Sequence, residues 1–366
     1  MCQDYAAGSV EMEGRSMNRR TPLLLISVAV LACMIVSGCS RDASRLDTSG
    51  GGTDISRVDL CGWVNASTAA MGGTFGVAGP AAAATAQTIR RSGDVTAVTC
   101  EVRSLGTGGI GQDETLGEVT LIRGGEAVKD ANPRGVAKKY SHGSYEGLSA
   151  EADYPPAALV AVQLEDGLVL NVEGFRAGSN VDMSTTSAAG TEPLMAQLLD
   201  QRDSHHIGEI PKDSMADAWA FCDSLGIPSS RDNLGVSAGD KLVISATGEP
   251  NTNGSTLGGV VDRGRRDCKM TLVDPNPGSA DIWPWNSPFG QEREVVDIEF
   301  FGFGSDDDAA SAAAGASTFP PGKVAAGKWA YGASPLVQNP GTQELLQQLS
   351  EKVAAAAVPE APAAGD

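Results

Sequence analysis

Apolar positions between residues 57 and 202 predict a short helix, several strands and a closing helix. Asp59 can cap a helix that carries Cys61 and Trp63, because a capping carboxylate accepts hydrogen bonds from the free N–H groups of the first turn. Apolar runs on both sides of Glu165-Asp166-Gly167 predict a β-hairpin, since Asp-Gly adopts the tight turn that joins two strands. The other elements expected here are strands at 95–102 and 118–123, the hairpin strands 158–164 and 168–175, and a helix that opens near 191–192 and carries Leu194, Leu198 and Leu199.

The same order of elements recurs between residues 214 and 353. A helix capped by Asp213 or Ser214 carries Cys222, and a helix that opens at Thr342 closes this half. The strands expected between them are 242–247, 268–273 and the alternating segment 295–303. A helix with a cysteine, a strand with a cysteine, further strands and a closing helix therefore occur twice, which indicates a divergent duplication.

We therefore expect an α+β fold of two tandem modules, residues 57–202 and 214–353. Each module should have its own antiparallel sheet with flanking helices. The polar segment 203–213 is interpreted as a linker. Residues 354–366 consist largely of alanine, proline and acidic residues, a composition that favours a disordered tail.

The first 38 residues have the parts of a bacterial signal peptide, with Met17 as the expected true start. Asn18-Arg19-Arg20 supplies positive charge, and the apolar run Leu23–Val36 is shorter than a membrane-spanning helix. The next residues, Val36-Ser37-Gly38-Cys39, resemble a lipobox, in which the cysteine thiol takes a diacylglycerol and becomes the new N-terminus. Polar residues 39–56 are then a flexible tether. The alternatives are an ordinary secretory signal and a transmembrane anchor that happens to contain Cys39.

Seven cysteines become four once Cys2, Cys33 and the lipidated Cys39 are set aside. An even number in an exported protein predicts two disulfides, for which three pairings exist. One bridge in each half gives Cys61 with Cys100 and Cys222 with Cys268. The alternative is four buried free thiols. No Cys or His grouping has the spacing of a zinc site, and we expect no metal and no cofactor.

The charge balance narrows the range of partners. The chain has 27 Lys and Arg residues against 46 Asp and Glu residues, a net charge of −19. Nucleic acid is therefore excluded as a partner, because its phosphates need a basic surface. No stretch of about 20 apolar residues exists, which excludes a multispanning membrane protein.

A family resemblance follows from the lipobox, the tether and the cysteine contexts. An Asp-Leu-Cys helix start at Cys61 and a Thr-Cys strand at Cys100 resemble the actinobacterial lipoproteins of unknown function that are built from cysteine-paired α+β modules. The contexts of Cys222 and Cys268 are looser matches. The resemblance implies a lipid-anchored surface protein and supplies no catalytic residues.

Two glycine motifs match catalytic or nucleotide-binding patterns only in their letters. Gly235-Val236-Ser237-Ala238-Gly239 has the GxSxG pattern, but it precedes a strand and no histidine follows it in the chain, so a hydrolase triad in the usual order is excluded. Gly106–Gly111 has the GxGxxG pattern, but it leads into a strand and not a helix. We interpret both as turns.

Acidic and histidine clusters are interpreted as surface features. Asp306-Asp307-Asp308 is contiguous, whereas calcium loops alternate their carboxylates with other ligands, so a solvated loop is expected. His142 stands alone, and the adjacent His205 and His206 cannot point the same way, which favours a linker over a metal site.

The residues most suggestive of binding are Trp283 and Trp285, which lie in a proline-containing loop. Two exposed indoles can stack on a sugar or a peptide, or they can fill the edge of a core. The sequence therefore predicts a lipid-anchored extracytoplasmic protein of the cell envelope with a non-enzymatic binding role. Its expected partners are the membrane through its lipid, and a cell-wall glycan or an envelope protein. The alternatives are a ligand-binding lipoprotein of a transport or sensing system, and an envelope enzyme with an unrecognised site.

Overall fold

The computed structural model describes residues 54–76, 81–104, 115–124, 138–153, 156–165, 167–175, 186–204, 207–232, 234–250, 263–273, 289, 292–315, 324–333 and 340–359. The expected signal peptide, most of the tether and the loop with Trp283 and Trp285 lie outside these ranges.

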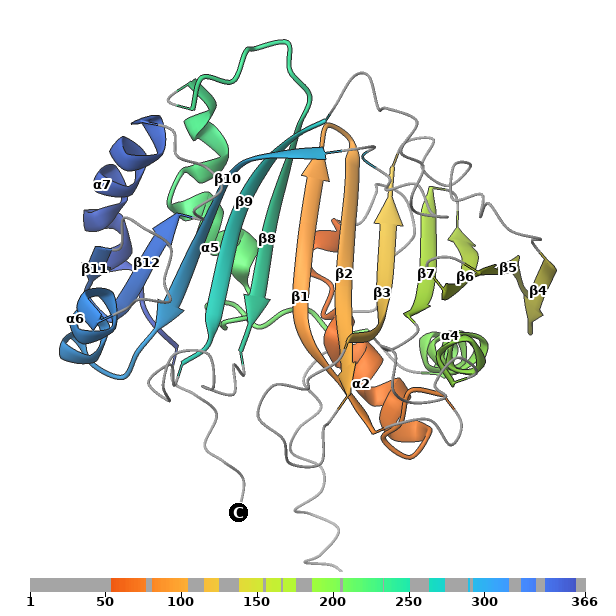
Figure 1. Ribbon diagram of the computed structural model, residues 1–366. Coiled ribbons are helices and arrows are strands. Elements are labelled where there is room, and N and C mark those ends of the chain that lie inside the picture. Colours follow the sequence, from red (N-terminus) through yellow and green to blue (C-terminus); the bar gives the residue numbers. More distant parts are fainter. Residues whose placement is uncertain are drawn as a thin grey trace, which may run out of the picture. The chain divides into compact units, whose positions relative to one another are not determined.

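Twelve strands of the described residues form one antiparallel sheet (Figure 1). In chain order they are β1 (Ala82–Ser92), β2 (Val95–Ser104), β3 (Thr115–Arg123), β4 (Lys138–His142), β5 (Tyr145–Asp153), β6 (Pro156–Glu165), β7 (Leu168–Phe175), β8 (Leu242–Glu249), β9 (Arg265–Val273), β10 (Glu292–Gly302), β11 (Val324–Ala326) and β12 (Trp329–Ala333). Their order across the sheet is β11-β12-β10-β9-β8-β1-β2-β3-β7-β6-β5-β4. The α-helices are α2 (Leu60–Ala70), α4 (Thr186–Ser204), α5 (Ala218–Ser224), α6 (Asp306–Gly315) and α7 (Pro340–Ala355), with 3₁₀ turns at Ile55–Arg57 and Ile227–Asp232.

The expectation of two tandem modules with separate sheets is wrong, because β1 and β8 pair with each other. Their antiparallel register runs from Gln87 opposite Gly248 to Arg91 opposite Ile244. The sequence of β1 is rich in alanine, threonine and arginine and gives a weak apolar pattern, so this strand is not predicted. Pairing with β8 satisfies backbone N–H and C=O groups that each half would otherwise leave unpaired at a sheet edge.

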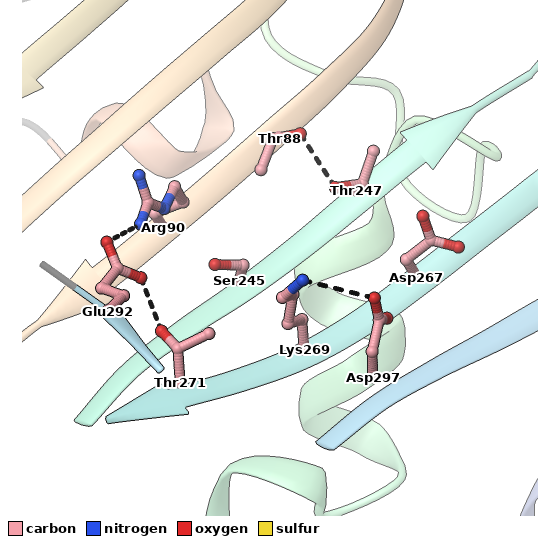
Figure 2. A pocket seen from close by; sticks show the side chains of 9 residues that line it. All are labelled: Thr88, Arg90, Ser245, Thr247, Asp267, Lys269, Thr271, Glu292 and Asp297. Carbon is pink, nitrogen blue, oxygen red and sulfur yellow. Dashed lines mark hydrogen bonds and ion pairs between the residues drawn. The ribbon is translucent and has the colours of Figure 1, made fainter. Parts of the chain in front are cut away.

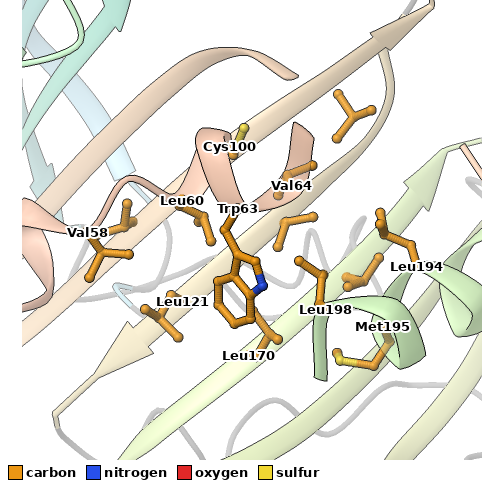
Figure 3. Packing of buried hydrophobic residues seen from close by; sticks show 14 of the residues in the cluster. Val58, Leu60, Trp63, Val64, Cys100, Leu121, Leu170, Leu194, Met195 and Leu198 are labelled. Carbon is orange, nitrogen blue, oxygen red and sulfur yellow. The ribbon is translucent and has the colours of Figure 1, made fainter. Parts of the chain in front are cut away.

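Helices α2, α4, α5 and α7 pack on one face of the sheet, which we call the helical face. Each half has its own apolar cluster there, one formed by residues between 55 and 210 and one by residues between 215 and 353. In the first cluster, Trp63 of α2 lies among Leu121, Leu170 and Leu198 (Figure 3). Burying a large apolar side chain of this kind contributes about 1.5–3 kcal/mol, so these clusters are the main source of the fold's stability.

An approximate two-fold axis perpendicular to the sheet relates the two halves. The disulfide cysteine of β2 lies opposite Gln87 of β1, and that of β9 lies opposite Ala246 of β8. Matching the two cysteines therefore matches Thr88 with Thr247. These two threonines lie opposite each other where β1 pairs with β8, as a two-fold axis requires, and their hydroxyls form a 2.8 Å hydrogen bond.

The order of strands away from this axis is also the same in both halves. β1-β2-β3-β7-β6 corresponds to β8-β9-β10-β12-β11, and a helix closes each half, α4 in the first and α7 in the second. Among the described strands, the second half has no counterpart of β4 or β5, and α6 precedes β11 there instead. This arrangement is the one that a divergent duplication would give.

Two disulfides tie the helical face to the sheet. Cys61 of α2 is bonded to Cys100 of β2, and Cys222 of α5 is bonded to Cys268 of β9. This is the pairing expected from one bridge in each half. Each bridge joins the first α-helix of a half to that half's second strand, so the disulfides occupy equivalent places about the two-fold axis.

Candidate functional site

The sheet face opposite α2 and α5 carries charged and hydroxyl side chains, and we call it the polar face. Side chains alternate along a strand, so Cys268 and Met270 of β9 point to the helical face, whereas Asp267, Lys269 and Thr271 point to the polar face. A pocket of about 350 Å³ lies there, over four neighbouring strands (Figure 2). Its lining residues are Thr88 and Arg90 of β1, Ser245 and Thr247 of β8, Asp267, Lys269 and Thr271 of β9, and Glu292 and Asp297 of β10.

The pocket depends on the junction between the two halves. Thr88 and Arg90 come from the first half, and the other lining residues come from the second. The Thr88–Thr247 hydrogen bond on the two-fold axis lies at its edge (Figure 2). Neither half alone would therefore form this site.

One wall of the pocket is a connected set of contacts around Arg90. The guanidinium of Arg90 forms an ion pair with one oxygen of Glu292, and the other oxygen accepts a 2.5 Å hydrogen bond from Thr271 Oγ1. Phe289 lies against the guanidinium, 4.7 Å from Cζ to the ring centroid, where cation–π attraction is effective. Arg90 would have to break these contacts to bind an anionic ligand.

The opposite wall contains Lys269 and the carboxylates around it. Lys269 Nζ lies 2.6 Å from Glu294 and 3.5 Å from Asp297 Oδ2. Arg265 donates from Nε and Nη2 to the two oxygens of Asp267, at 2.8 and 2.5 Å. Lys269 in this wall and Arg265 next to it are thus both already bonded to carboxylates of the protein.

Burial raises the pKa of several carboxyls on this face. The pKa of Asp297 is raised from 3.8 to about 6, first because burial disfavours its charged form and then because Asp267 carries a like charge nearby; Lys269 offsets only part of this. Burial likewise raises the pKa of Glu299 on β10 and of Glu249 on β8. Asp297 therefore changes its charge within the pH range of many natural environments.

Two polar groups in the pocket have no hydrogen-bond partner among the described residues. One is the hydroxyl of Ser245, whose residue is only 8% exposed and whose side chain lies between the two walls (Figure 2). The other is Asp297 Oδ1. A buried polar atom without a partner costs about 1–3 kcal/mol, a cost that applies to Asp297 Oδ1, whereas Ser245 lines the pocket and can offer its hydroxyl to a bound molecule.

The residues that carry the sequence-based binding and anchoring predictions lie outside the described ranges. These are Cys39, Trp283 and Trp285. The Gly106–Gly111 motif, interpreted as a turn, and His205 and His206, interpreted as part of a linker, also lie outside the described ranges. The predictions made for them are neither confirmed nor contradicted.

The GxSxG segment is a turn before β8. Gly235 has a φ of 69°, and the backbone N–H of Ser237 donates a 3.0 Å hydrogen bond to Asp240. Ser237 is exposed and lies before a strand, so it lacks the strand–turn–helix setting of a nucleophile.

Asp306, Asp307 and Asp308 form the first turn of α6 and not a loop. Ser305 precedes them, and its Oγ accepts a 3.2 Å hydrogen bond from the backbone N–H of Asp308. Three carboxylates at a helix N-terminus are favourable because the helix dipole is positive there. The expectation of a loop overlooked this capping signal.

His142 lies at the end of β4, where its Nε2 is 2.7 Å from Asp200 of α4. It therefore takes part in a contact between the sheet and a helix. No group of three or more His, Cys, Asp or Glu residues within the described ranges is arranged to hold a metal ion, and none of the helices described there is long and apolar enough to cross a membrane.

The pocket residues were missed because their signal is charge alternation and not a motif. Arg265, Asp267 and Lys269 occupy every second position of β9, and Glu292 and Glu294 do so in β10. Strands that alternate charged and apolar residues are common at a solvent-facing sheet surface. Only the pairing of β1 with β8 brings such residues together around a pocket.

Comparison with known proteins provides no relative. No family model matches the chain, and no curated protein or solved structure gives a significant match.

Proposed function

We propose that the protein is exported, is anchored to the outer side of the cell membrane by a lipid on Cys39, and binds a small ligand in the polar-face pocket. The two disulfides support export, because such bonds persist in oxidising compartments outside the cytoplasm. The lipobox-like Val36-Ser37-Gly38-Cys39 supports the lipid anchor. The pocket of about 350 Å³, which Ser245 lines without a hydrogen bond to another described residue, is the observation that carries ligand binding.

The pocket favours a ligand-binding lipoprotein of a transport or sensing system over a purely structural envelope protein. Its volume falls within the lower range of small-molecule sites. Contact with a cell-wall glycan or an envelope protein rests on Trp283 and Trp285 and stays a separate prediction.

A second candidate function is an envelope hydrolase, favoured by the raised pKa of Asp297. A protonated carboxyl can act as a general acid when an ionised carboxylate lies across the substrate. The other carboxylates of the pocket, Asp267 and Glu292, are bonded to Arg265 and to Arg90 with Thr271. We therefore favour binding. If the wild type hydrolyses members of a chromogenic glycoside panel and Asp297→Asn does not, the hydrolase would be favoured instead.

Lipid anchoring is tested by intact-mass analysis of the membrane fraction. The wild type and Val36→Leu, which keeps the lipobox pattern, should carry an acylated N-terminal Cys39. Cys39→Ser should be released into the medium. Continued membrane retention of Cys39→Ser would indicate a transmembrane anchor, and an unacylated N-terminus elsewhere would indicate an ordinary secretory signal.

Ligand binding is tested by protein-observed NMR with a library of polar small molecules. Ser245→Leu places a larger apolar group in the pocket and should abolish the ligand-induced shifts. Thr120→Leu is the matched control, because Thr120 lies on β3 and does not line the pocket. Equal binding by both variants, or no binding by the wild type, would contradict the proposal.

A further inference from the structure

We propose that the ligand of the polar-face pocket is an uncharged molecule with several hydroxyl groups, of the size of one sugar ring, which binds over the hydroxyls of Ser245, Thr247 and Thr88. This inference rests on the proposed binding function and specifies the class of its ligand. It follows from the pairing of the charged residues in the described lining, from the hydroxyls that keep hydrogen-bonding capacity, and from the size of the pocket.

The Arg90 wall offers a ligand no uncompensated charge. The guanidinium pairs with Glu292 and lies over the ring of Phe289, and the second oxygen of Glu292 accepts the hydrogen bond from Thr271. An anionic ligand would compete with Glu292 for Arg90, and a cationic ligand would compete with Arg90 for Glu292. Either exchange would leave one partly buried charge of the protein without its partner, which is costly.

The opposite wall is compensated in the same way. Lys269 Nζ lies 2.6 Å from Glu294 and 3.5 Å from Asp297 Oδ2, so an ammonium of the protein itself fills the place beside Asp297. The other oxygen, Asp297 Oδ1, is buried from solvent. Both oxygens of Asp267 accept hydrogen bonds from Arg265. The described lining therefore holds no charge that a charged ligand would neutralise.

The hydrogen-bonding capacity that remains belongs to uncharged hydroxyls. Ser245 lies between the two walls without a hydrogen bond to another described residue (Figure 2), so its hydroxyl can both donate and accept. Thr88 and Thr247 share one hydrogen bond of 2.8 Å, which uses only one of their two hydroxyl hydrogens. The pair can therefore donate one further hydrogen bond and accept others.

Ligand hydroxyls match these groups because they also donate and accept. Ser245 and Thr247 are two residues apart on β8 and face the same side, so their Cα atoms are about 6.6–6.8 Å apart. A ligand with hydroxyls at several positions can bond to both at once. An ammonium or a carboxylate would instead exchange water for hydroxyls that carry no opposite charge, and burying a charge in this way is costly.

The size and rigidity of the pocket favour a small ligand. Its volume of about 350 Å³ lies near the lower end of the range of about 300–1,000 Å³ for small-molecule sites, which fits a single sugar ring better than a chain of several rings. The lining side chains project from four neighbouring strands of one sheet. Their hydroxyls are thus held in place before the ligand arrives, which reduces the entropy lost on binding.

The test measures dissociation constants of the full mature chain by calorimetry for glucose, galactose and mannose. The amino sugar and the uronate of each are matched analogues that keep the ring and carry one positive or one negative charge. We expect at least one neutral sugar to bind, with both of its charged analogues weaker by about tenfold or more. Its affinity should change by less than about twofold as salt is raised, since no ion pair forms or breaks.

Two hydroxyl deletions locate the bound sugar. Ser245→Ala should weaken binding about tenfold, and so should Thr247→Val, which replaces the hydroxyl with a methyl group. Thr120→Val is the matched control. Thr120 of β3 forms a 3.0 Å hydrogen bond with Thr99 directly opposite on β2, as Thr247 does with Thr88, and it does not line the pocket. This variant should bind the sugar as the wild type does.

The outcomes distinguish this inference from the function on which it rests. An amino sugar or a uronate that binds as tightly as its parent sugar would overturn the uncharged class while ligand binding stands. The same conclusion follows if members of the polar library bind the pocket but no sugar or other uncharged polyol does. Sugar binding that neither Ser245→Ala nor Thr247→Val weakens would overturn the inference as well. If no sugar and no library member binds, both the inference and the proposed function are overturned.

Discussion

At the scale of single residues, hydrogen bonding decides which carboxyls of the polar face stay ionised. Glu101 and Asp297 are both partly buried, and burial alone would raise the pKa of each. Glu101 nevertheless has a lowered pKa, because Arg103 and Thr115 donate hydrogen bonds to it. Asp297 lacks comparable donors and lies near Asp267. Two similar side chains on one face thus have opposite tendencies.

Asp297 should make stability depend on pH. Its folded-state pKa of about 6 exceeds the ordinary 3.8, so the folded state binds more protons than the unfolded state between these values. The free energy of unfolding should therefore fall as pH rises through this window, by about 3 kcal/mol at most from this group. Urea unfolding of wild type and Asp297→Asn at pH 4, 5, 6 and 7 measures the effect.

Asp297→Asn should show a smaller decline than the wild type between pH 4 and pH 6. Asp223→Asn, which changes an exposed carboxyl of α5, is the control and should follow the wild type. Parallel curves for wild type and Asp297→Asn would mean that this carboxyl is ionised as readily in the folded chain as in the unfolded one.

The described tryptophans make the prediction for Trp283 and Trp285 easier to test. Trp63 and Trp329 are 6% and 0% exposed, and Trp219 is partly buried against Arg91. Acrylamide is neutral, so the chain's negative charge does not repel it. Strong quenching of tryptophan fluorescence by acrylamide should therefore come mainly from Trp283 and Trp285, the other two of the five tryptophans. The double variant Trp283→Phe/Trp285→Phe should be quenched much less. If quenching is unchanged, the loop is packed and the binding idea for these indoles fails.

At the scale of elements, the sequence was informative where a strand or helix carried its own signal. The Asp59 cap, the Asp-Gly turn between β6 and β7 and the leucines of α7 are local features, and the structure has the corresponding elements. β1 has no such signal, because its helical-face positions include Gln87, whose amide is buried and donates to the backbone oxygen of Val58. A strand stabilised by pairing and by a buried amide is not visible as apolar alternation. The pocket could not be predicted for the same reason, since it exists only where β1 meets β8.

The disulfides should stabilise both halves through the shared sheet. Replacing Cys61 and Cys100 together with alanine, or Cys222 and Cys268 together, should each lower the free energy of unfolding by about 2–5 kcal/mol. Because β1 and β8 join the two apolar clusters, calorimetry should show one unfolding transition in the wild type and in both variants. Two separate transitions, with only one shifted by each variant, would mean that the halves unfold independently.

At the scale of the whole described chain, two apolar clusters share one sheet and a smaller cluster spans their junction. That smaller cluster lies on the polar face and contains Val95, Ala97, Ile122, Val243 and Phe289. It brings residues of both halves into contact beside the pocket. The architecture therefore resembles a pair of repeated units fused through their strand edges, with the pocket lined by residues of both units.

The two outer strands of the sheet have a consequence for the lipid-anchored state that we propose. Lipid anchoring confines molecules to a plane, where neighbours meet edge to edge far more often than in free solution. Among the described strands, one end of the sheet is β11, which has three residues, and the other is β4, which presents exposed Lys138 and Lys139. A short strand offers few backbone groups to a neighbour, and lysines repel a like edge. If Cys39 carries the proposed lipid, crowded copies should therefore slide past one another in the membrane plane without stacking their sheets into fibres.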